Sequence, residues 1–440
     1  MPELMQQNNS TENYIHLFFD EKEGVKNKKI ITSNHFVSHM IEHIAWRLGV
    51  AIDLSWNNEN WRELGRMLGQ EIKALAFTSD EAAALGMIDD GSVEVYIQQN
   101  SANPQVTMEV VFDVELDYFL NLRCEQIDSG QSLQDLLDGI SKGMEADIYV
   151  RICSHEDTHH TWEGLFRAIG IALSKCLEKP NNVQDVCKTR ESKTDAPTIQ
   201  GQGSLDIKDV TATTARVSRK TAESEVEFFI DLKKPAGFKM IEMRVDDSIQ
   251  DENRCNINDI ADFLDGFAKE ADLYTEAIFI ATKLSSSHVV LEDMGMVIGR
   301  AYLEILKVRM ELDGANGAGS SVHTKKDFEN NQQVRAGIST EGRKFWKFVP
   351  YNQSYKDFKK NYLIGHTVHG KLFSEDLDDF FDGFAGGSSS SIIIGIPSAD
   401  VAVEEMWKQT FSSFGKAVKE SLAVNPYRKG LPPGVKATLI

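Results

Sequence analysis

ADFLDGFA at residues 261–268 and DDFFDGFA at residues 378–385 are two versions of one short stretch, and QDLLDGIS at residues 134–141 is a third. Each version begins a helical pattern, and each is followed by a β-rich run: EAIFIAT, SIIIGIP and DIYVRIC, respectively. A second helical pattern follows every run. A stretch that recurs with the same neighbours indicates an internally repeated fold.

The second helices of the repeats share residues in register. HHTWEGLFRAIGIALSKCL (159–177) and EEMWKQTFSSFGKAVKESL (404–422) align Trp162 with Trp407 and Gly170 with Gly415. SSSHVVLEDMGMVIGRAYLEIL, which starts at residue 285, fits the same pattern, and a diverged copy runs from HFVSHMIEHIAWRLG through VAIDLSW to NENWRELGRMLGQEI. The sequence therefore predicts a helix–strand–helix unit repeated four times. Each unit should place its helices on one face of a β-sheet, which is a two-layer α+β arrangement.

The length of the chain, 440 residues, exceeds one ordinary compact core and predicts two or more domains. Residues 179–203 are polar and lack periodicity, so they are predicted to link two paired halves, residues 1–205 and residues 206–440. Flexible residues 312–332 contain glycines but lack the GKS or GKT of a phosphate-binding loop. The most economical organisation is two tandem domains of two units each.

Charge and cysteine usage exclude several classes of partner and compartment. The formal charge of −20 argues against nucleic acid or an anionic membrane as partner. The first residues resemble no signal peptide, and no stretch has the length and apolarity of a membrane span. The five cysteines lack any CxxC spacing, which suits a reducing compartment. We expect a cytoplasmic protein.

DTHHTWEGLFRAIG, residues 157–170, carries a candidate metal site. On a helix His159 and Glu163 share a face, and His160 lies three residues before the same glutamate. Imidazole and carboxylate ligands without thiolate suit Mn, Fe, Ni or Zn. The alternative is a pair of solvated or capping histidines on a helix surface. The third unit keeps the same ligand types as His288 and Glu292, which favours a metal site.

The remaining two units have a cationic side chain where the ligand carboxylate would stand. The first unit has Asn58, Glu59 and Arg62 at these positions, and the fourth has Glu404, Glu405 and Lys408. A guanidinium or ammonium group there would repel a divalent ion and could pair with neighbouring carboxylates. We interpret these two places as metal-free, salt-bridged forms of the same site.

These residues resemble imidazoleglycerol-phosphate dehydratase, a dimanganese lyase of histidine biosynthesis that is itself an internal duplication with a His-His-x-x-Glu helix in each half. DTHHTWEGLFRAIG resembles the second such helix of the family, and SSHVVLEDMGMVIG resembles the first. ARVSRKTAESEVEFFIDL (215–232) resembles its opening strand, and NPYRKGLPPGVKATLI at the C-terminus resembles its closing segment. The resemblance covers nearly the whole chain as two tandem copies, about 1–205 and 206–440.

The resemblance implies a fold like ribosomal protein S5 domain 2 and a homo-oligomer of high symmetry with active sites between subunits. It implies loss of water from imidazoleglycerol phosphate, a phosphorylated imidazole, at two Mn²⁺ ions. A further family ligand histidine is kept as His39 and replaced by aspartate in the other units. The implied composite site is the following set of metal ligands: Asp135, His159, His160, Glu163, Asp262, His288 and Glu292.

The resemblance also suggests residues for chemistry and for the substrate phosphate. Glu223 is the candidate acid/base carboxylate, with Glu163 as a second possibility; the alternative for Glu223 is an exposed strand residue. Arg167 and Lys436 are the surviving phosphate candidates, and the alternative for Lys436 is a solvated terminal lysine. Other expected cations are replaced, for example by Thr340 and His366, and Gly434 stands where serine is expected. Loss of these cations affects recognition of the phosphate.

Three functions remain open from the sequence. The first is the family lyase reaction at one composite dimetal site. The second is a non-catalytic, diverged paralogue with a structural or regulatory role, favoured by the loss of half the metal helices and of most phosphate cations. The third is a related dehydratase with a different imidazole or hydroxy-acid substrate. Metal content and turnover of imidazoleglycerol phosphate discriminate between them.

Overall fold

The computed structural model of the protein describes residues 13–112, 115–125, 127–177, 204–246, 249, 254–398 and 400–434. The helices and strands of the N-terminal half are β1 (Tyr14–Phe18), η1 (Gly24–Lys26), β2 (Lys28–Thr32), α1 (His35–Leu48), β3 (Ala51–Trp56), α2 (Trp61–Lys73), β4 (Glu81–Ile88), β5 (Gly91–Gln98), β6 (Val106–Val110), α3 (Leu116–Leu120), α4 (Gln131–Met144), β7 (Asp147–His155) and α5 (Thr158–Cys176).

The C-terminal half continues with β8 (Ser204–Lys208), β9 (Thr214–Lys220), β10 (Ser224–Asp231), β11 (Gly237–Val245), α6 (Ile257–Glu270), β12 (Tyr274–Ala281), α7 (Ser287–Leu312), β13 (Ala318–Ser320), α8 (Lys325–Glu329), β14 (Arg335–Ser339), β15 (Phe345–Pro350), α9 (Tyr355–Phe358), η2 (Lys359–Leu363), β16 (Thr367–His369), β17 (Leu372–Phe373), α10 (Ser374–Ser388), β18 (Ser391–Ile396), α11 (Val403–Leu422) and η3 (Pro426–Arg428). The predicted linker at 179–203 lies outside the described residues, so the domain boundary stays a prediction.

The four larger sheets differ in their number of strands but share one parallel strand pair. The orders are β1-β3-β2, β4-β5-β7-β6, β11-β12-β10-β9-β8 and β13-β14-β18-β15. In each sheet the strand after the first long helix of its unit pairs in parallel with the strand before that helix: β3 with β2, β7 with β6, β12 with β11, and β18 with β15. Such parallel pairing needs a crossover connection, which the helix supplies. The predicted α+β class, with helices on one face of each sheet, is confirmed.

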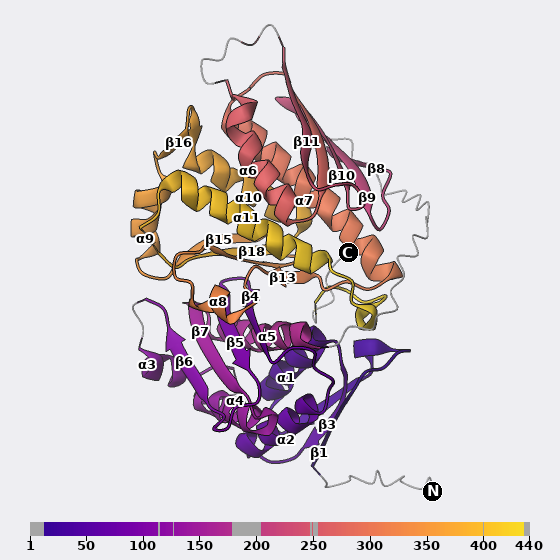
Figure 1. The fold of residues 1–440 in the computed structure, drawn as a ribbon, viewed down its shortest axis with the longest axis vertical. Coiled ribbons are helices and arrows are strands. Elements are labelled where there is room, and N and C mark those ends of the chain that lie inside the picture. The colour runs from indigo at the N-terminus through magenta and orange to yellow at the C-terminus, as the bar shows by residue number, and fades with distance from the viewer. Residues whose placement is uncertain are drawn as a thin grey trace, which may run out of the picture.

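The helices of each half pack across units. In the N-terminal half α1 packs on α5 and α2 on α4; in the C-terminal half α6 packs on α11 and α7 on α10. The helices therefore lie between the two sheets of their half. Figure 1 shows the N-terminal half below and the C-terminal half above, with β13, β15 and β18 lying between α11 and the lower half.

Close helix contacts explain the glycine of the recurring motif. A Cβ added to Gly139 would lie 2.1 Å from the carbonyl oxygen of Arg62, and one added to Gly383 would lie 2.4 Å from that of Glu292. These backbones can approach only because glycine has no side chain. Gly266, at the same motif position in α6, has nothing within 4 Å of an added Cβ. In two of the three copies of the motif, close packing of the helices therefore requires glycine.

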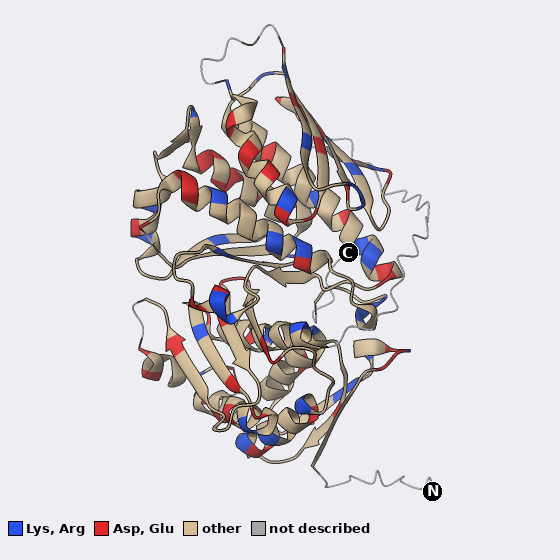
Figure 2. Ribbon diagram, viewed as in Figure 1, with Lys and Arg blue, Asp and Glu red and all other residues tan. Residues whose placement is uncertain are grey.

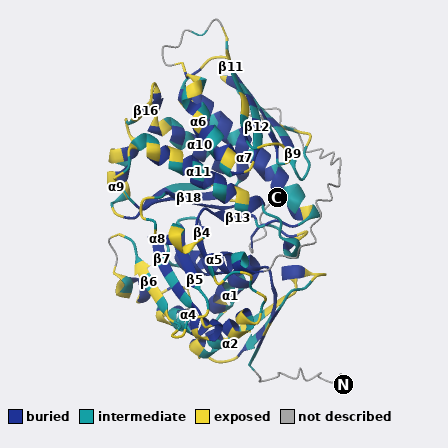
Figure 3. Cartoon of the chain, in the orientation of Figure 1, coloured by how far each residue is buried: buried dark blue, intermediate teal, exposed yellow. Residues whose placement is uncertain are grey.

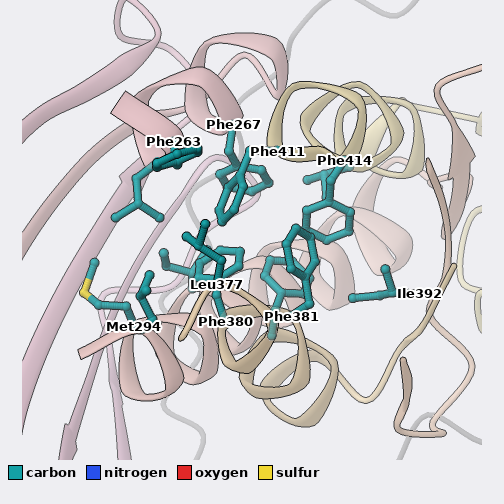
Figure 4. Packing of buried hydrophobic residues seen from close by; sticks show 14 of the residues in the cluster. Phe263, Phe267, Met294, Leu377, Phe380, Phe381, Ile392, Phe411 and Phe414 are labelled. Atoms are coloured by element: carbon teal, nitrogen blue, oxygen red, sulfur yellow. The ribbon is translucent and has the colours of Figure 1, made fainter. Parts of the chain in front are cut away.

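Each half has its own hydrophobic core. One core draws its buried residues from Ile15 to Leu177, and the other draws them from Ala215 to Leu422. In the second core the aromatic rings of Phe267, Phe380, Phe411 and Phe414 meet where α6, α10 and α11 converge (Figure 4). The separate cores explain how each half can bury its own helices.

The two halves meet through one sheet of each. Leu85 of β4 donates its backbone N–H to the hydroxyl of Ser320, and Met87, Cys153, Val349, Tyr351 and Ile393 form a small buried cluster across the boundary. Buried Glu94 of β5 accepts hydrogen bonds from Tyr351 and Arg151 and forms an ion pair with Arg335. Figure 3 shows β4 and β18 as mostly buried strands in the middle of the molecule. The halves therefore form one body.

Charged residues are distributed unevenly over the elements. Figure 2 shows acidic residues recurring along α6, α10 and α11. In the part of the chain that the structure describes, no helix combines the length and the apolarity needed to cross a membrane.

Candidate metal centre

Helices α1 and α5 bring histidines and a glutamate together in the N-terminal half. Asp157 caps α5 by accepting the backbone N–H of His160, which places His159 in the first helical turn. Asn34 caps α1 in the same way, and Gly49 ends that helix in a left-handed conformation. His39, His43 and Glu163 are spaced so that the ligand atoms of all three lie within 4.8 Å of one another.

Three imidazole nitrogens converge on one carboxylate oxygen. The Nε2 atoms of His39, His159 and His43 lie 2.7, 3.0 and 3.5 Å from Glu163 Oε1, and the Nε2 atoms of His39 and His43 lie 3.2 Å apart. Two atoms bound to one transition-metal ion at about 2.1 Å lie about 3.0 to 3.4 Å from each other. The spacing of His39, His43 and Glu163 therefore fits ligands of a single ion, and His159 contacts the same carboxylate oxygen.

The outer nitrogens of two of the histidines are held by further carboxylates. His159 Nδ1 lies 3.0 Å from Glu125 Oε1, and His39 Nδ1 lies 3.4 Å from Glu42 Oε2. A metal-binding histidine commonly donates its other ring N–H to a carboxylate, which fixes the tautomer and directs the free nitrogen to the metal. This arrangement leaves the Nε2 atoms of His39 and His159 directed at the same point. The cluster therefore has the donor set and the supporting contacts of a metal centre.

The electrostatics of the cluster keep Glu163 ionised. Burial opposes ionisation, but hydrogen bonds from His159, His39 and His43 outweigh it and hold the pKa of Glu163 well below its usual range. Burial also opposes charge on His39, yet its hydrogen bonds to Glu163 and Glu42 raise its pKa to about 9. Burial, assisted by the charge of Arg167, lowers the pKa of His43 to about 3, so His43 is a neutral imidazole that can donate a lone pair.

Three related places occur where the first helix of one unit packs on the second helix of the neighbouring unit. At the α2–α4 contact Arg62 pairs with Asp135 at 2.7 Å. At the α6–α11 contact Lys408 pairs with Glu404 at 2.7 Å. This hydrogen bond raises the pKa of Lys408, and the negative charge of Asp262 raises it further. At the α7–α10 contact His288 lies 2.5 Å from Asp379 and 3.9 Å from Glu292. The first two places form the ion pairs that the sequence predicts for Arg62 and Lys408.

The predicted ligands are distributed over several places in one chain. Of the seven, the structure brings His159 and Glu163 into the α1–α5 cluster. His160 lies beside them but directs Nδ1 at Asp90, 2.7 Å away. Asp135, Asp262, His288 and Glu292 belong to the other helix contacts described above. The side chain of His288 is 54% exposed, so this group lacks the burial of the α1–α5 cluster.

The predicted catalytic and phosphate-binding residues lie in different surroundings. Glu223 is exposed in the turn between β9 and β10, where its backbone carbonyl accepts hydrogen bonds from Thr282 and Lys283. Arg167 is buried one helical turn after Glu163, and its guanidinium group contacts both oxygens of Glu341, at 2.5 and 3.1 Å. Lys436 lies outside the described residues.

Sequence reasoning left two side chains of the cluster out of the predicted site. His39 was noted as a retained ligand of the resembled family, whereas His43 was assigned no role. The available signal was their spacing of four residues in SHMIEH, which places both on one face of α1. The contact between α1 and α5 links residues more than 115 positions apart and has no local signature.

The fold and the cluster define an α+β protein with a histidine–carboxylate centre between two packed helices. The chain is similar to imidazoleglycerol-phosphate dehydratases. That of Pyrococcus furiosus is 24% identical over 167 residues, 36% of this chain and 88% of the relative. That of Leuconostoc mesenteroides subsp. mesenteroides is 25% identical over 228 residues, 50% and 95% of the two chains, and that of Lactiplantibacillus plantarum is 26% identical over 204 residues, 42% and 96%.

Two solved structures of this enzyme also match part of the chain. IGPD from Pyrococcus furiosus, solved in complex with (S)-C348, gives a TM-score of 0.31 at 24% identity and covers 40% of this chain and 94% of the other. The enzyme from Staphylococcus aureus gives 0.32 at 13% identity, with 38% and 94% covered. No family model matches the chain. The sequence similarities confirm the predicted resemblance, and these relatives each correspond to half of the chain or less.

Proposed function

We propose that the protein is a metal-dependent lyase of the imidazoleglycerol-phosphate dehydratase type, with a metal ion held by His39, His43 and Glu163 and with His159 bound to the same carboxylate. The observation that carries this proposal is the convergence of three imidazole nitrogens on the buried carboxylate of Glu163. We further propose that residues 1–205 and 206–440 are two dehydratase-like copies. In this scheme the α1–α5 place is the retained centre, and the Arg62 and Lys408 places are salt bridges.

Nitrogen and carboxylate ligands without thiolate suit Mn²⁺ or another divalent transition metal. Such an ion, when bound, supplies Lewis acidity that stabilises an anionic imidazole and so acidifies the neighbouring carbon. In this chain Glu42 and Glu125 orient the imidazoles of His39 and His159. The buried guanidinium of Arg167 lies 3.9 Å from Glu163 Oε2, beside the ligands, and supplies positive charge next to the centre.

The proposed reaction also needs a place for a second metal ion and a carboxylate that acts as acid and base. His160 with Asp90 is the nearest remaining histidine–carboxylate pair of the same helix end. His288, Glu292 and Glu223 would join the centre only across an interface between copies of the chain, because within one chain they lie at other contacts. This composite arrangement predicts that a His288→Ala variant loses metal, whereas a centre confined to α1 and α5 predicts that it does not.

Turnover is tested with purified protein loaded with Mn²⁺ and supplied with imidazoleglycerol phosphate. Loss of water should be detectable and should disappear in Glu163→Gln, which keeps the size of the side chain but removes its charge. The matched control is Glu405→Gln, which makes the same change at an exposed position of the salt-bridged α6–α11 place. Turnover that is equal in wild type and Glu163→Gln would exclude this centre as the site of reaction.

A second candidate function is a non-catalytic protein that retains the fold and a metal. The observation that favours it is the pairing of Arg167, the predicted phosphate ligand, with Glu341. A substrate phosphate would have to compete with this buried carboxylate for the same guanidinium. Stoichiometric metal binding together with absence of turnover would support this candidate, or a dehydratase whose substrate carries no phosphate.

A further inference from the structure

A cavity lies between the two halves, where β6 and β7 end beside β15 and the segment that leads into α9. Its volume is about 220 Å³. Val111 and Phe112 line it directly after β6, and residues 153–156 line it at the end of β7. Residues 347–350 of β15 and residues 353–355 complete the wall from the C-terminal half. Figure 1 shows β15 and α9 above β6 and β7. We call this space the boundary cavity.

The walls of the boundary cavity are apolar and well packed. Phe348, Val349 and Cys153 line it, and each is at most 5% exposed. Val349 and Cys153 also belong to the buried cluster that joins the halves. Two other aromatic rings at the cavity, those of Phe112 and Tyr355, are instead 39% and 40% exposed. Large exposed rings beside a cavity with apolar walls are typical of a binding site for a small molecule.

One positive charge lines the boundary cavity. The side chain of Lys347 is 18% exposed, whereas the side chain of its ion-pair partner, Glu156, is 60% exposed. The ammonium group of Lys347 also lies 5.7 Å from the centre of the Tyr355 ring. An ion pair with so exposed a carboxylate contributes little, so an anion in the cavity can compete with Glu156 for the lysine. The cavity therefore favours an anionic ligand over a cationic one.

A second polar group of the cavity wall lacks a hydrogen-bond partner. Gln353 lines the cavity, and its Nε2 atom is buried without an acceptor in the part of the chain that the structure describes. The Oε1 atom of the same amide accepts a hydrogen bond from Asn361 at 3.3 Å, which orients the amide. A buried donor without an acceptor is unfavourable, and an oxygen atom of a ligand satisfies it. Lys347 and Gln353 together provide the donors that a carboxylate accepts.

The volume and the rings of the cavity limit the kind of ligand. An apolar cavity of about 150 Å³ admits a benzene ring, so the larger boundary cavity admits a molecule with two fused rings. Aromatic side chains pack favourably on other aromatic rings in offset or edge-on contacts. The rings of Phe112, Phe348 and Tyr355 therefore favour an aromatic ligand over an alkyl chain.

We propose that the boundary cavity binds a small aromatic carboxylate. The rings of the ligand pack on Phe348 and Val349, and its carboxylate binds Lys347 and Gln353. Such a ligand contacts both halves of the chain at once. This inference concerns the boundary cavity alone and holds whether or not the protein is a lyase.

The test is the binding of 2-naphthoate to the full-length protein, measured by isothermal titration calorimetry. Two compounds with the same ring system serve for comparison: the neutral 2-naphthamide and the cationic 2-naphthylmethylamine. We expect 2-naphthoate to bind once per chain and about 10-fold more tightly than either comparison compound. The proposal is overturned if 2-naphthoate does not bind, or if the amide or the amine binds as tightly.

Lys347→Met removes the charge but keeps most of the length of the side chain. It should weaken the binding of 2-naphthoate about 10-fold and leave the binding of 2-naphthamide unchanged. Lys344→Met is the matched control, because Lys344 directly precedes β15 and forms an ion pair with Asp382 at 2.7 Å, outside the wall of the cavity. Equal weakening of 2-naphthoate binding by the two variants would overturn the proposal.

Two further variants keep the proposal testable if Lys347→Met does not fold. Glu156→Gln removes the exposed carboxylate that competes for Lys347, so it should tighten the binding of 2-naphthoate by about 2- to 5-fold. Tyr355→Ala removes a ring of the wall and should weaken the binding of both 2-naphthoate and 2-naphthamide. Binding that matches wild type in both variants would overturn the assignment of the ligand to this cavity.

Discussion

Alanine in place of Gly383 and of Gly266 should change stability in opposite directions, although both glycines occupy the same place in a DGFA motif. The Cβ of Gly383→Ala would lie 2.4 Å from the backbone carbonyl oxygen of Glu292, which cannot move without shifting α7. Overpacking of this kind costs about 1–3 kcal/mol. An added Cβ at Gly266 meets nothing within 4 Å, so Gly266→Ala should stabilise α6 by about 0.5–1 kcal/mol through helix propensity.

The assay is urea unfolding followed by circular dichroism, with thermal unfolding as a second measurement. A difference of about 1.5–4 kcal/mol between the two variants should separate their thermal midpoints by about 3–16 °C for a half of this size. The combined test compares one chemical change at two equivalent positions, so differences in the unfolded chain largely cancel. Equal stability of the two variants, or a less stable Gly266→Ala, would refute the assigned helix contacts.

Three further outcomes follow from particular contacts. Gly434→Ala should lower the free energy of unfolding, because its Cβ would meet the side chain of Glu341. The same substitution should cost much less in a Glu341→Ala variant. A double-mutant cycle that finds no coupling between the two positions would contradict the contact. Burial, together with the charge of Lys175, lowers the pKa of His323 to about 4. As the pH falls from 6.5 to 4, this histidine is therefore protonated in the unfolded chain but neutral in the folded chain. Stability should therefore fall over that range, and His323→Gln should show a smaller fall when thermal midpoints are compared. Arg62→Met removes exposed ion pairs to Asp135 and Asp138, so its free energy of unfolding should change by less than about 1 kcal/mol and its metal content should match wild type.

The local parts of the fold could be predicted from the sequence. The recurring DG motif with its following β-rich run predicts the first helix and the central strand in three of the four units, because both depend on short-range patterns. The spacing of four residues between His159 and Glu163, after the capping residue Asp157, likewise places both side chains on one face of a helix. The register of the repeats, together with the charge of Arg62 and Lys408, predicts ion pairs at these positions, and both residues form them.

The pairing of helices across units could not be predicted in the same way. Whether α5 meets α1 or α4 depends on tertiary packing, and the sequence interpretation grouped Asp135 with His159, whereas the structure pairs Asp135 with Arg62. His43 has no counterpart in the other units, so comparison between repeats gave it no role. The contacts of Glu341 with Arg47 and with Arg167 join the two halves over 294 and 174 residues, and no sequence spacing indicates them.

The most direct test of the metal centre is the transition-metal content of purified chain after loading with Mn²⁺ and removal of free ion. The variants are His39→Asn and Glu163→Gln, and His288→Asn is the control from the exposed α7–α10 place. The account predicts bound metal in wild type and in His288→Asn, with affinity at least about 10-fold weaker in the other two. Metal that is retained by His39→Asn and Glu163→Gln, or that is absent from wild type, would contradict a metal centre between α1 and α5.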